Sequence, residues 1–399
     1  MAKVKITGHA SGSGVLTITA PNTSTDRTVT LPDATGTLLN SDGSAASLTA
    51  IPAAQITGTL PAISGASLTG VNAVNGGRKN LIINGGMDVW QRATSFALTN
   101  GKAYTADRFW LNPQTNESTH SRQAVTSPIA GMASQYCLRI QRNINISQTG
   151  LIYFATDLES TNAFACRGRK LTLSFYARKH ATGYTATSSL FSLGIVSGKG
   201  TDQSLVSGYT SGAFVANQSN TLTSSWQRFT VTTSSVIADD ITQIGLQGTR
   251  TSVGTAGTND YMEITGIQLE ISDAATDFEY RSYGEELALC QRYFFRIPGN
   301  ASDARCIGLG FNQNTTLTNL YLNFPVEMRS EVTVTQAGVE VLTGAATIAV
   351  NLNGIFDKSL LGQRVRFSAA SGTPFVSDEA SLIRIDAGAS NYIQADAEL

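Results

Sequence analysis

Charged side chains are scarce in this sequence. Asp, Glu, Lys and Arg make up only 14% of its 399 residues, and the formal net charge is −1. Soluble domains typically carry about 25% charged residues. Because basic residues are not in excess, the chain has no positive electrostatic field that would attract nucleic acid or an anionic membrane surface. We therefore expect neither as a partner.

Long apolar runs are also missing. No stretch approaches the roughly 18–20 consecutive apolar residues of a membrane-spanning helix, so we expect no membrane insertion. The opening residues, Met1 to Thr7, lack the apolar core of a secretory signal. The sequence therefore predicts that the protein is made in the cytoplasm and leaves it only if something carries it out.

Cysteine and histidine are rare. The cysteines form no C-x-x-C pair, which argues against a zinc site and favours buried, reduced thiols. The four cysteines are Cys137, Cys166, Cys290 and Cys306, and the three histidines, none at metal-ligand spacing, are His9, His120 and His180.

Recognisable catalytic motifs are absent as well. There is no G-x-S-x-G and no H-E-x-x-H sequence. The adjacent carboxylates Asp239-Asp240 point to opposite faces if they lie on a strand, and Glu285-Glu286 suit the first turn of a helix. Because glycoside hydrolysis needs two converging carboxylates, the sequence favours a protein that is not an enzyme.

What the sequence does contain is a long uncharged segment between Gly43 and Gly77. It is too rich in Gly and Pro for a helix and too interrupted for a long strand. Its spaced aliphatic side chains are Ile51, Ile56, Leu60, Ile63, Leu68 and Val71. Burial of these side chains in one copy would not offset about 1–2 kcal/mol of backbone entropy per residue. The segment is either a loose linker or a shaft wound with identical chains, and we favour a trimeric shaft over 44–78.

Alternating apolar residues predict a β-hairpin before this segment. The runs 15–19 and 27–31 alternate around a loop rich in turn residues. Because an isolated hairpin is marginally stable in water, we expect residues 1–43 to form a small β module that pairs with a neighbour.

Residues 79–281 predict an antiparallel β-sandwich of the jelly-roll type. We expect a short buried strand at 80–84 and a loop-rich surface region from 180 to 220, dense in Gly, Ser and Thr. The further strand candidates are 171–176, 226–232 and 261–269.

A helix and a second, smaller β-domain are predicted for 282–399. Ser282 and Glu285 have the spacing of a capping box, and Leu287, Cys290 and Phe294 follow at helical spacing. The strand candidates beyond this helix are 305–311, 320–326, 346–352, 363–368 and 381–385.

Sugar binding is the chemistry that the composition supports best. Aromatic faces stack on sugars, and the abundant Ser, Asn and Gln side chains can bind hydroxyl groups. Tyr184 and Tyr209 lie in the polar region 180–220 and are the candidate exposed ligand-binding aromatics. The tryptophans sit beside apolar residues and are expected in the core: Trp90, Trp110 and Trp226.

Several stretches together resemble bacteriophage tail fibre proteins. They cover most of the chain, and only their combination is specific. They are Gly14 to Leu38, Arg78 to Arg92, Tyr104 to Trp110, Gly266 to Glu270, Phe278 to Leu287, Cys290 to Phe294 and the ending Ala395 to Leu399.

This resemblance implies an elongated, multi-domain, homotrimeric fibre that resides in the virion. Its N-terminal region would attach to other tail or baseplate proteins, and its distal β-domains would bind glycan on the host surface. Two alternatives remain: a purely structural tail or capsid connector, and a fibre-borne glycan depolymerase.

The block from Asn80 to Gln268 is similar to jelly-roll carbohydrate-binding modules. The residues on which this resemblance depends are Asn80-Leu81, Asn84-Gly85 and Met87-Asp88 at the opening, and a W-x-x-F-x-V strand that begins at Trp226. Such modules often hold a structural calcium ion. The resemblance implies Asp88 as one ligand, and near the closing strand this chain offers Glu263 but not the usual pair of aspartates.

Overall fold

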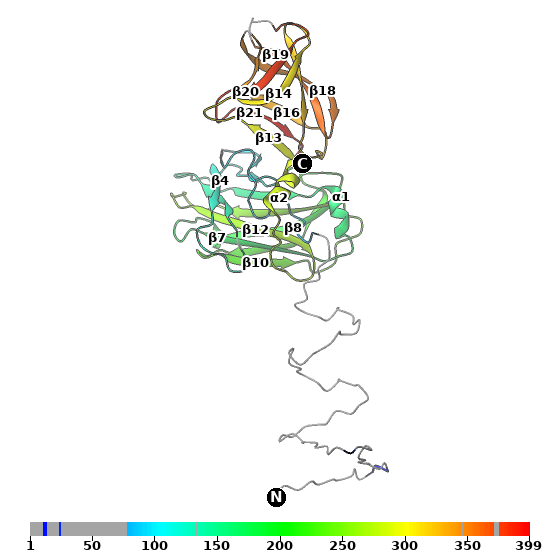
Figure 1. Cartoon of the computed structure of the whole chain (residues 1–399). Coiled ribbons are helices and arrows are strands. Elements are labelled where there is room, and N and C mark those ends of the chain that lie inside the picture. Colours follow the sequence, from blue (N-terminus) through cyan, green and yellow to red (C-terminus); the bar gives the residue numbers. More distant parts are fainter. Residues whose placement is uncertain (1–10, 14–23, 25–77, 133, 345, 371–374) are drawn as a thin grey trace. The chain divides into compact units, whose positions relative to one another are not determined.

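The computed structural model describes residues 11–13, 24, 78–132, 134–344, 346–370 and 375–399 (Figure 1). The chain divides into two units, Met1–Ala73 and Val74–Leu399, and nearly all described residues belong to the second. The predicted hairpin, most of the shaft segment and the six aliphatic shaft residues lie outside the described residues.

Two six-stranded antiparallel sheets form the sandwich (Figure 1). The first has the order β1 (Ser95–Leu98), β4 (Ser118–Ala124), β5 (Tyr136–Arg142), β12 (Tyr261–Ile271), β7 (Leu171–Lys179) and β10 (Gln227–Thr232). The second has the order β2 (Ala103–Tyr104), β3 (Trp110–Asn112), β6 (Leu151–Asp157), β11 (Gln243–Thr251), β8 (Leu190–Lys199) and β9 (Thr210–Thr221). The predicted antiparallel jelly-roll fold is confirmed, as are the strands at 171–176, 226–232 and 261–269.

The inner faces of these sheets enclose one core. Phe109 and Phe154 stack with ring centroids 5.2 Å apart, and Phe175 meets Phe191 edge to face. Buried aliphatic residues from β7, β8, β11 and β12 surround them. Two short helical segments follow β6, namely α1 (Ser160–Ala163) and η3 (Phe164–Cys166), and η4 (Thr187–Ser189) precedes β8.

Two local predictions are wrong. The region 180–220 contains the long strands β8 and β9 instead of a surface loop, because β9 pairs along β8 although its own side chains are mostly polar and exposed. Residues 80–84 form no strand. They enter a turn in which Asn84 and Met87 adopt positive φ angles of 60° and 59°.

A helix links the sandwich to the C-terminal β-domain. The helix α2 (Tyr283–Gln291) is shorter than the apolar spacing indicated, since Phe294 lies in β13 (Phe294–Pro298). The predicted capping contact is present, because Ser282 Oγ accepts a hydrogen bond from Glu285 N at 3.3 Å. No helix in the described ranges is both long enough and apolar enough to cross a membrane.

The C-terminal β-domain consists of a small sheet and a closed barrel around a second core. The sheet has the order β13, β21 (Tyr392–Asp396) and β16 (Thr333–Ala337). The barrel has the order β14 (Arg305–Asn312), β15 (Leu317–Asn323), β19 (Gly362–Ala369), β18 (Thr347–Ser359), β17 (Val339–Leu342) and β20 (Ala380–Ile385). Cys306 on β14 is exposed, which corrects the expectation that all four thiols are buried.

Candidate ligand-binding pocket

A pocket of about 460 Å³ opens where the turn before Asp88 meets the start of α2. One wall comes from β4 and the start of β5, and the other comes from the segment that enters α2. The described lining residues are Gly86, Asp88, Arg122, Met132, Ser134, Gln135, Tyr136, Phe278, Tyr280, Arg281, Tyr283 and Glu286. We call it the Asp88 pocket. Its volume falls within the range of small-molecule sites.

The turn at 84–87 shapes the floor of this pocket. The buried Asn84 side chain accepts a hydrogen bond from Val89 N at 2.9 Å and donates to Val89 O and Asp107 O, so it replaces backbone pairing that the turn lacks. A Cβ atom on Gly86 would lie only 2.7 Å from Asp88 Oδ2. The glycine therefore leaves the space that the Asp88 carboxyl group occupies.

Ionic contacts fix the opposite wall. Arg281 donates to Ile82 O at 3.0 Å and to the Glu286 carboxylate at 3.2 Å, and it also donates to Asn80 O. The Glu286 carboxylate in turn accepts a hydrogen bond from Asn84 N. These contacts tie the first turn of α2 to the floor of the Asp88 pocket.

Asp88 supplies a carboxyl group with a raised pKa. Burial, together with the nearby Glu286 carboxylate, raises its pKa to about 6, although Arg122 opposes the shift. The Arg122 guanidinium lies over the Tyr136 ring, 4.5 Å from its centroid. The pocket thus offers a carboxyl group and a guanidinium beside an aromatic face.

Aromatic side chains form the rim. Tyr280 and Tyr283 are 53% and 61% exposed, and Phe278 contacts Tyr280 edge to face with centroids 5.2 Å apart. In the sequence, these residues stand out only as part of the resemblance to tail fibre proteins. The signal that could have identified them is the cluster of three aromatic residues within six positions, at and just before the capping box and outside any predicted strand.

The tyrosines that the sequence singled out are not exposed. Tyr184 and Tyr209 are only 8% and 7% exposed, so that expectation is wrong. Arg250 lies over the Tyr184 ring at 4.4 Å, and Tyr209 donates from its hydroxyl group to Asp157 Oδ1 at 2.7 Å. Each is engaged within the sandwich and not presented at its surface. Of the tryptophans, Trp90 and Trp110 are buried as expected, whereas Trp226 is half-buried.

The residues suggested for calcium do not fit a calcium site. Glu263 accepts hydrogen bonds from Arg139 and from Arg178, both at 2.6 Å, and these guanidinium groups would repel a cation. Glu263 is not among the residues that line the Asp88 pocket. In the described part of the chain, no group of three His, Cys, Asp or Glu residues is arranged to hold a metal ion.

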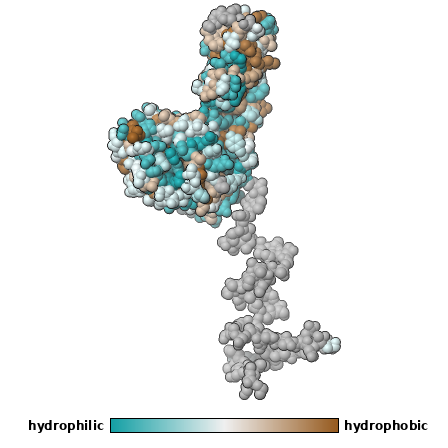
Figure 2. All heavy atoms as spheres, turned by 60° about the vertical axis from the view of Figure 1, so that its left-hand side comes forward, coloured by the Kyte–Doolittle hydropathy of each residue, from teal (hydrophilic) through white to brown (hydrophobic). Residues whose placement is uncertain are grey.

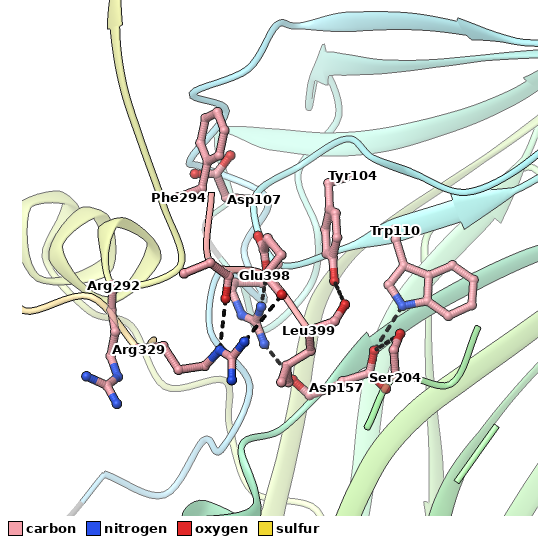
Figure 3. A network of polar contacts seen from close by, with 12 residues as sticks. Tyr104, Asp107, Trp110, Asp157, Ser204, Arg292, Phe294, Arg329, Glu398 and Leu399 are labelled. Carbon is pink, nitrogen blue, oxygen red and sulfur yellow. Dashed lines mark hydrogen bonds and ion pairs between the residues drawn. The ribbon is translucent and has the colours of Figure 1, made fainter. Parts of the chain in front are cut away.

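A polar network joins the sandwich to residues 396–399 (Figure 3). Figure 3 shows Trp110 and Ser204 directed at Asp157. Each donates a hydrogen bond to Asp157 Oδ2, at 3.0 and 3.2 Å. Tyr104 and Lys102 donate to the carbonyl oxygen of Leu399 at 2.9 and 2.8 Å. Because most of its polar groups pair with one another, this network connects the two β parts and leaves little for a ligand.

A second open hollow, of about 450 Å³, lies on the outer face of the barrel. Its wall includes Leu309, Phe311 and Tyr321, which are 73%, 52% and 50% exposed. Figure 2 shows hydrophobic surface gathered on the C-terminal β-domain, whereas the visible face of the sandwich is mostly hydrophilic. The described residues that line this hollow include no carboxyl group, in contrast to those of the Asp88 pocket.

No protein-family model matches the chain, and no curated protein matches it. Among solved structures, the chain is similar to a protein described as "CBM4 structure and function", with 16% identity over 47% of this chain and 98% of that chain and a TM-score of 0.28. It is also similar to TmCBM61 in complex with β-1,4-galactotriose, with 10% identity over 49% of this chain and 100% of that chain and a TM-score of 0.28.

A third similar structure is the enzymatically active domain of tailspike protein 4 from bacteriophage CBA120. The identity is 12%, over 45% of this chain and 21% of that chain, and the TM-score is 0.29. The neighbours thus include carbohydrate-binding modules and a phage tailspike domain. The two sheets of this chain themselves establish the sandwich, and its function has to be inferred from its own residues.

Proposed function

We propose that this chain is a subunit of a bacteriophage tail fibre that binds glycan on the host surface without cleaving it. The observation that carries the glycan-binding part is the pairing of exposed Tyr280 and Tyr283 with the carboxyl and guanidinium groups of the Asp88 pocket. Aromatic faces pack against the apolar faces of sugar rings, while charged groups bind their hydroxyls.

The fibre part of the proposal has a different basis. It depends on the resemblances around Gly14 to Leu38 and Arg78 to Arg92, and on the uncharged segment that a trimer would bury. Assembly into a trimer would place three Asp88 pockets on one particle-borne fibre in the virion. Such multivalency strengthens attachment without any new contact.

Glycan cleavage is the second candidate, because Asp88 and Glu286 both line the pocket. A carboxyl group with a pKa of about 6 is suited to a general acid. However, the Glu286 carboxylate already accepts hydrogen bonds from Asn84 N and Arg281. These contacts hold α2 against the turn, which is a structural role and not a catalytic one. We therefore favour binding without cleavage.

A glycan array with the full chain, followed by a reducing-end assay on each bound glycan, tests the proposal. We expect retained glycan, no new reducing ends, and at least about tenfold weaker binding by Tyr280→Ala, since aromatic anchors carry much of the binding energy. The matched control is Tyr321→Ala, which removes a similarly exposed tyrosine from the barrel.

The other outcomes contradict the proposal in distinct ways. New reducing ends would establish a depolymerase, and the absence of any bound glycan would favour a structural connector. Light scattering addresses assembly separately, because a monomer at micromolar concentration would contradict the trimeric fibre.

A further inference from the structure

A third hollow lies between the segment that precedes β1 and the strands β13 and β21. It has a volume of about 670 Å³. Its principal lining side chains are Arg92, Thr94, Phe96, Arg296, Tyr392 and Gln394, and the remaining ones are small. We call it the Arg296 hollow. None of the described residues that line it is acidic.

Arg296 on β13 dominates this hollow. Its guanidinium group lies over the Tyr392 ring, 4.2 Å from the centroid. It donates through Nη1 to Arg92 O at 2.8 Å and to Gln394 Oε1 at 3.5 Å, whereas Nε is buried and has no hydrogen-bond partner among the described residues. The strand and the tyrosine thus hold the guanidinium in place, and its Nε donor is left unused.

No carboxylate of the described chain forms an ion pair with Arg296. The neighbouring Arg92 differs, because Asp396 and Glu398 lie 3.2 and 3.4 Å from its Nη2. Burial and the like charge of Arg92 both lower the pKa of Arg296, although Tyr392 opposes them. The hollow therefore contains a partly desolvated positive charge that an external anion would stabilise.

We propose that the Arg296 hollow is a second binding site, which takes the carboxylate of an acidic sugar residue. A guanidinium group is planar and matches the two oxygens of a carboxylate. Thr94, Gln394 and the aromatic ring of Phe96 surround it with partners for a sugar ring, and the volume exceeds what a small inorganic ion fills. The site is separate from the Asp88 pocket and goes beyond the function proposed above.

The test is calorimetric titration of the full chain with a tetragalacturonate and with its carboxyl-reduced counterpart. We expect binding of the acidic oligosaccharide only, and at least a tenfold loss of affinity in Arg296→Gln. Arg305→Gln, which removes an exposed guanidinium from the same β-domain, is the matched control and should bind as the wild type does. Ser390→Trp fills the hollow from its exposed edge without altering Arg296, and it should also abolish binding.

Several outcomes separate this proposal from its rivals. Unchanged affinity in both Arg296→Gln and Ser390→Trp would overturn it, as would equal binding of the carboxyl-reduced oligosaccharide. If inorganic sulfate or phosphate displaced the oligosaccharide at equal concentration, the site would be a general anion site and not an acidic-sugar site. Tyr280→Ala should leave this binding unchanged, so a failure here is distinguishable from a failure of the Asp88 pocket.

Discussion

The guanidinium group of Arg108 forms an ion pair with the carboxylate of Glu398, which lies 290 positions later in the chain. Their side chains are only 3% and 4% exposed. Arg108 also donates to Asp157 O at 2.6 Å and lies over the Tyr293 ring at 3.5 Å. The end of the described C-terminal β-domain is thus fixed to the sandwich by a buried, compensated pair.

Arg108→Gln should destabilise the protein strongly, because it leaves Glu398 buried without its cationic partner. Loss of one member of a buried ion pair typically costs about 3–5 kcal/mol. Urea unfolding followed by tryptophan fluorescence measures the change. The control is Lys358→Gln, whose exposed pair with Glu331 should be worth less than about 1 kcal/mol. Adding Glu398→Gln to Arg108→Gln should restore part of the loss, and equal losses in Arg108→Gln and the control would contradict the buried pair.

Tyr209→Phe should reduce stability without changing glycan affinity. The hydroxyl group donates to the Asp157 carboxylate at 2.7 Å, and a hydrogen bond to a charged group contributes about 1.5–3 kcal/mol. Unfolding curves measure the first effect and glycan titration the second. Tyr321→Phe removes an exposed hydroxyl group and serves as the control. A variant with normal stability and weak glycan binding would support the original interpretation of Tyr209 as a ligand-binding residue.

The strands that could be predicted from the sequence contain an apolar alternation of their own, although β7 and β12 are buried on both faces. In β7, Leu171, Leu173 and Phe175 alternate toward the core, so a period of two is visible in the sequence. Strand β9 lacks this signal because it lies at a sheet edge and owes its conformation to pairing with β8. That pairing is non-local and leaves little trace in its own residues.

The candidate site was predictable only in part. Asp88 was singled out, but as a calcium ligand, whereas the structure places it in a pocket with an arginine and aromatic residues. The positions of Tyr280 and Tyr283 depend on how α2 is held against the sandwich. Arg281 holds the start of α2 against the sandwich through hydrogen bonds to the carbonyl groups of Asn80 and Ile82, about 200 positions earlier in the chain. No local pattern encodes that arrangement.

Because of Asp107, the free energy of unfolding should decrease as the pH rises from about 4 to 7. Burial raises its pKa to about 6, although Arg92 and Gln91 oppose the shift, so the folded protein keeps a proton that the unfolded chain has already lost. Its stabilising contribution is present below the unfolded pKa and is lost as the pH passes through the folded pKa. Relative to Asp107→Asn, the wild type should therefore lose on the order of 2–3 kcal/mol of unfolding free energy over this interval. Urea titrations at four pH values measure it, with Asp303→Asn, at an exposed position, as control. A flat difference would contradict the raised pKa.

His120 should give the free energy of unfolding the opposite pH dependence, with a decrease as the pH falls. Burial, assisted by the positive charge of Arg250, lowers its pKa to about 3, and its Nε2 lies 2.7 Å from Ser118 Oγ. The unfolded chain binds a proton at this residue below about pH 6.5, while the folded protein does not, so this contribution to stability falls as the pH falls through that range. The ring nitrogen chemical shifts of His120 should remain those of a neutral imidazole between pH 7 and 4. A titration with a midpoint near 6.5 would show that the side chain is accessible.

Two glycine substitutions near the Asp88 pocket should have effects of opposite sign. A Cβ atom on Gly85 would lie 2.0 Å from Ile267 O, and a backbone carbonyl on a central strand cannot easily move. Gly85→Ala should therefore destabilise by at least about 1–3 kcal/mol, the usual penalty of overpacking. A Cβ atom on Gly284, in the first turn of α2, meets no atom of the described residues within 4 Å. Because alanine favours a helix over glycine, Gly284→Ala should stabilise by up to about 1 kcal/mol.

Thermal unfolding of both variants measures these changes, and glycan titration separates stability from the geometry of the site. Gly85→Ala displaces the turn that carries Asp88. The molecules of this variant that remain folded should therefore also bind glycan more weakly than the wild type. Gly284→Ala leaves Tyr283 and Glu286 on the same helix and should bind as the wild type does. If Gly85→Ala folded with normal stability and bound glycan normally, the close approach of this turn to β12 would not shape the pocket.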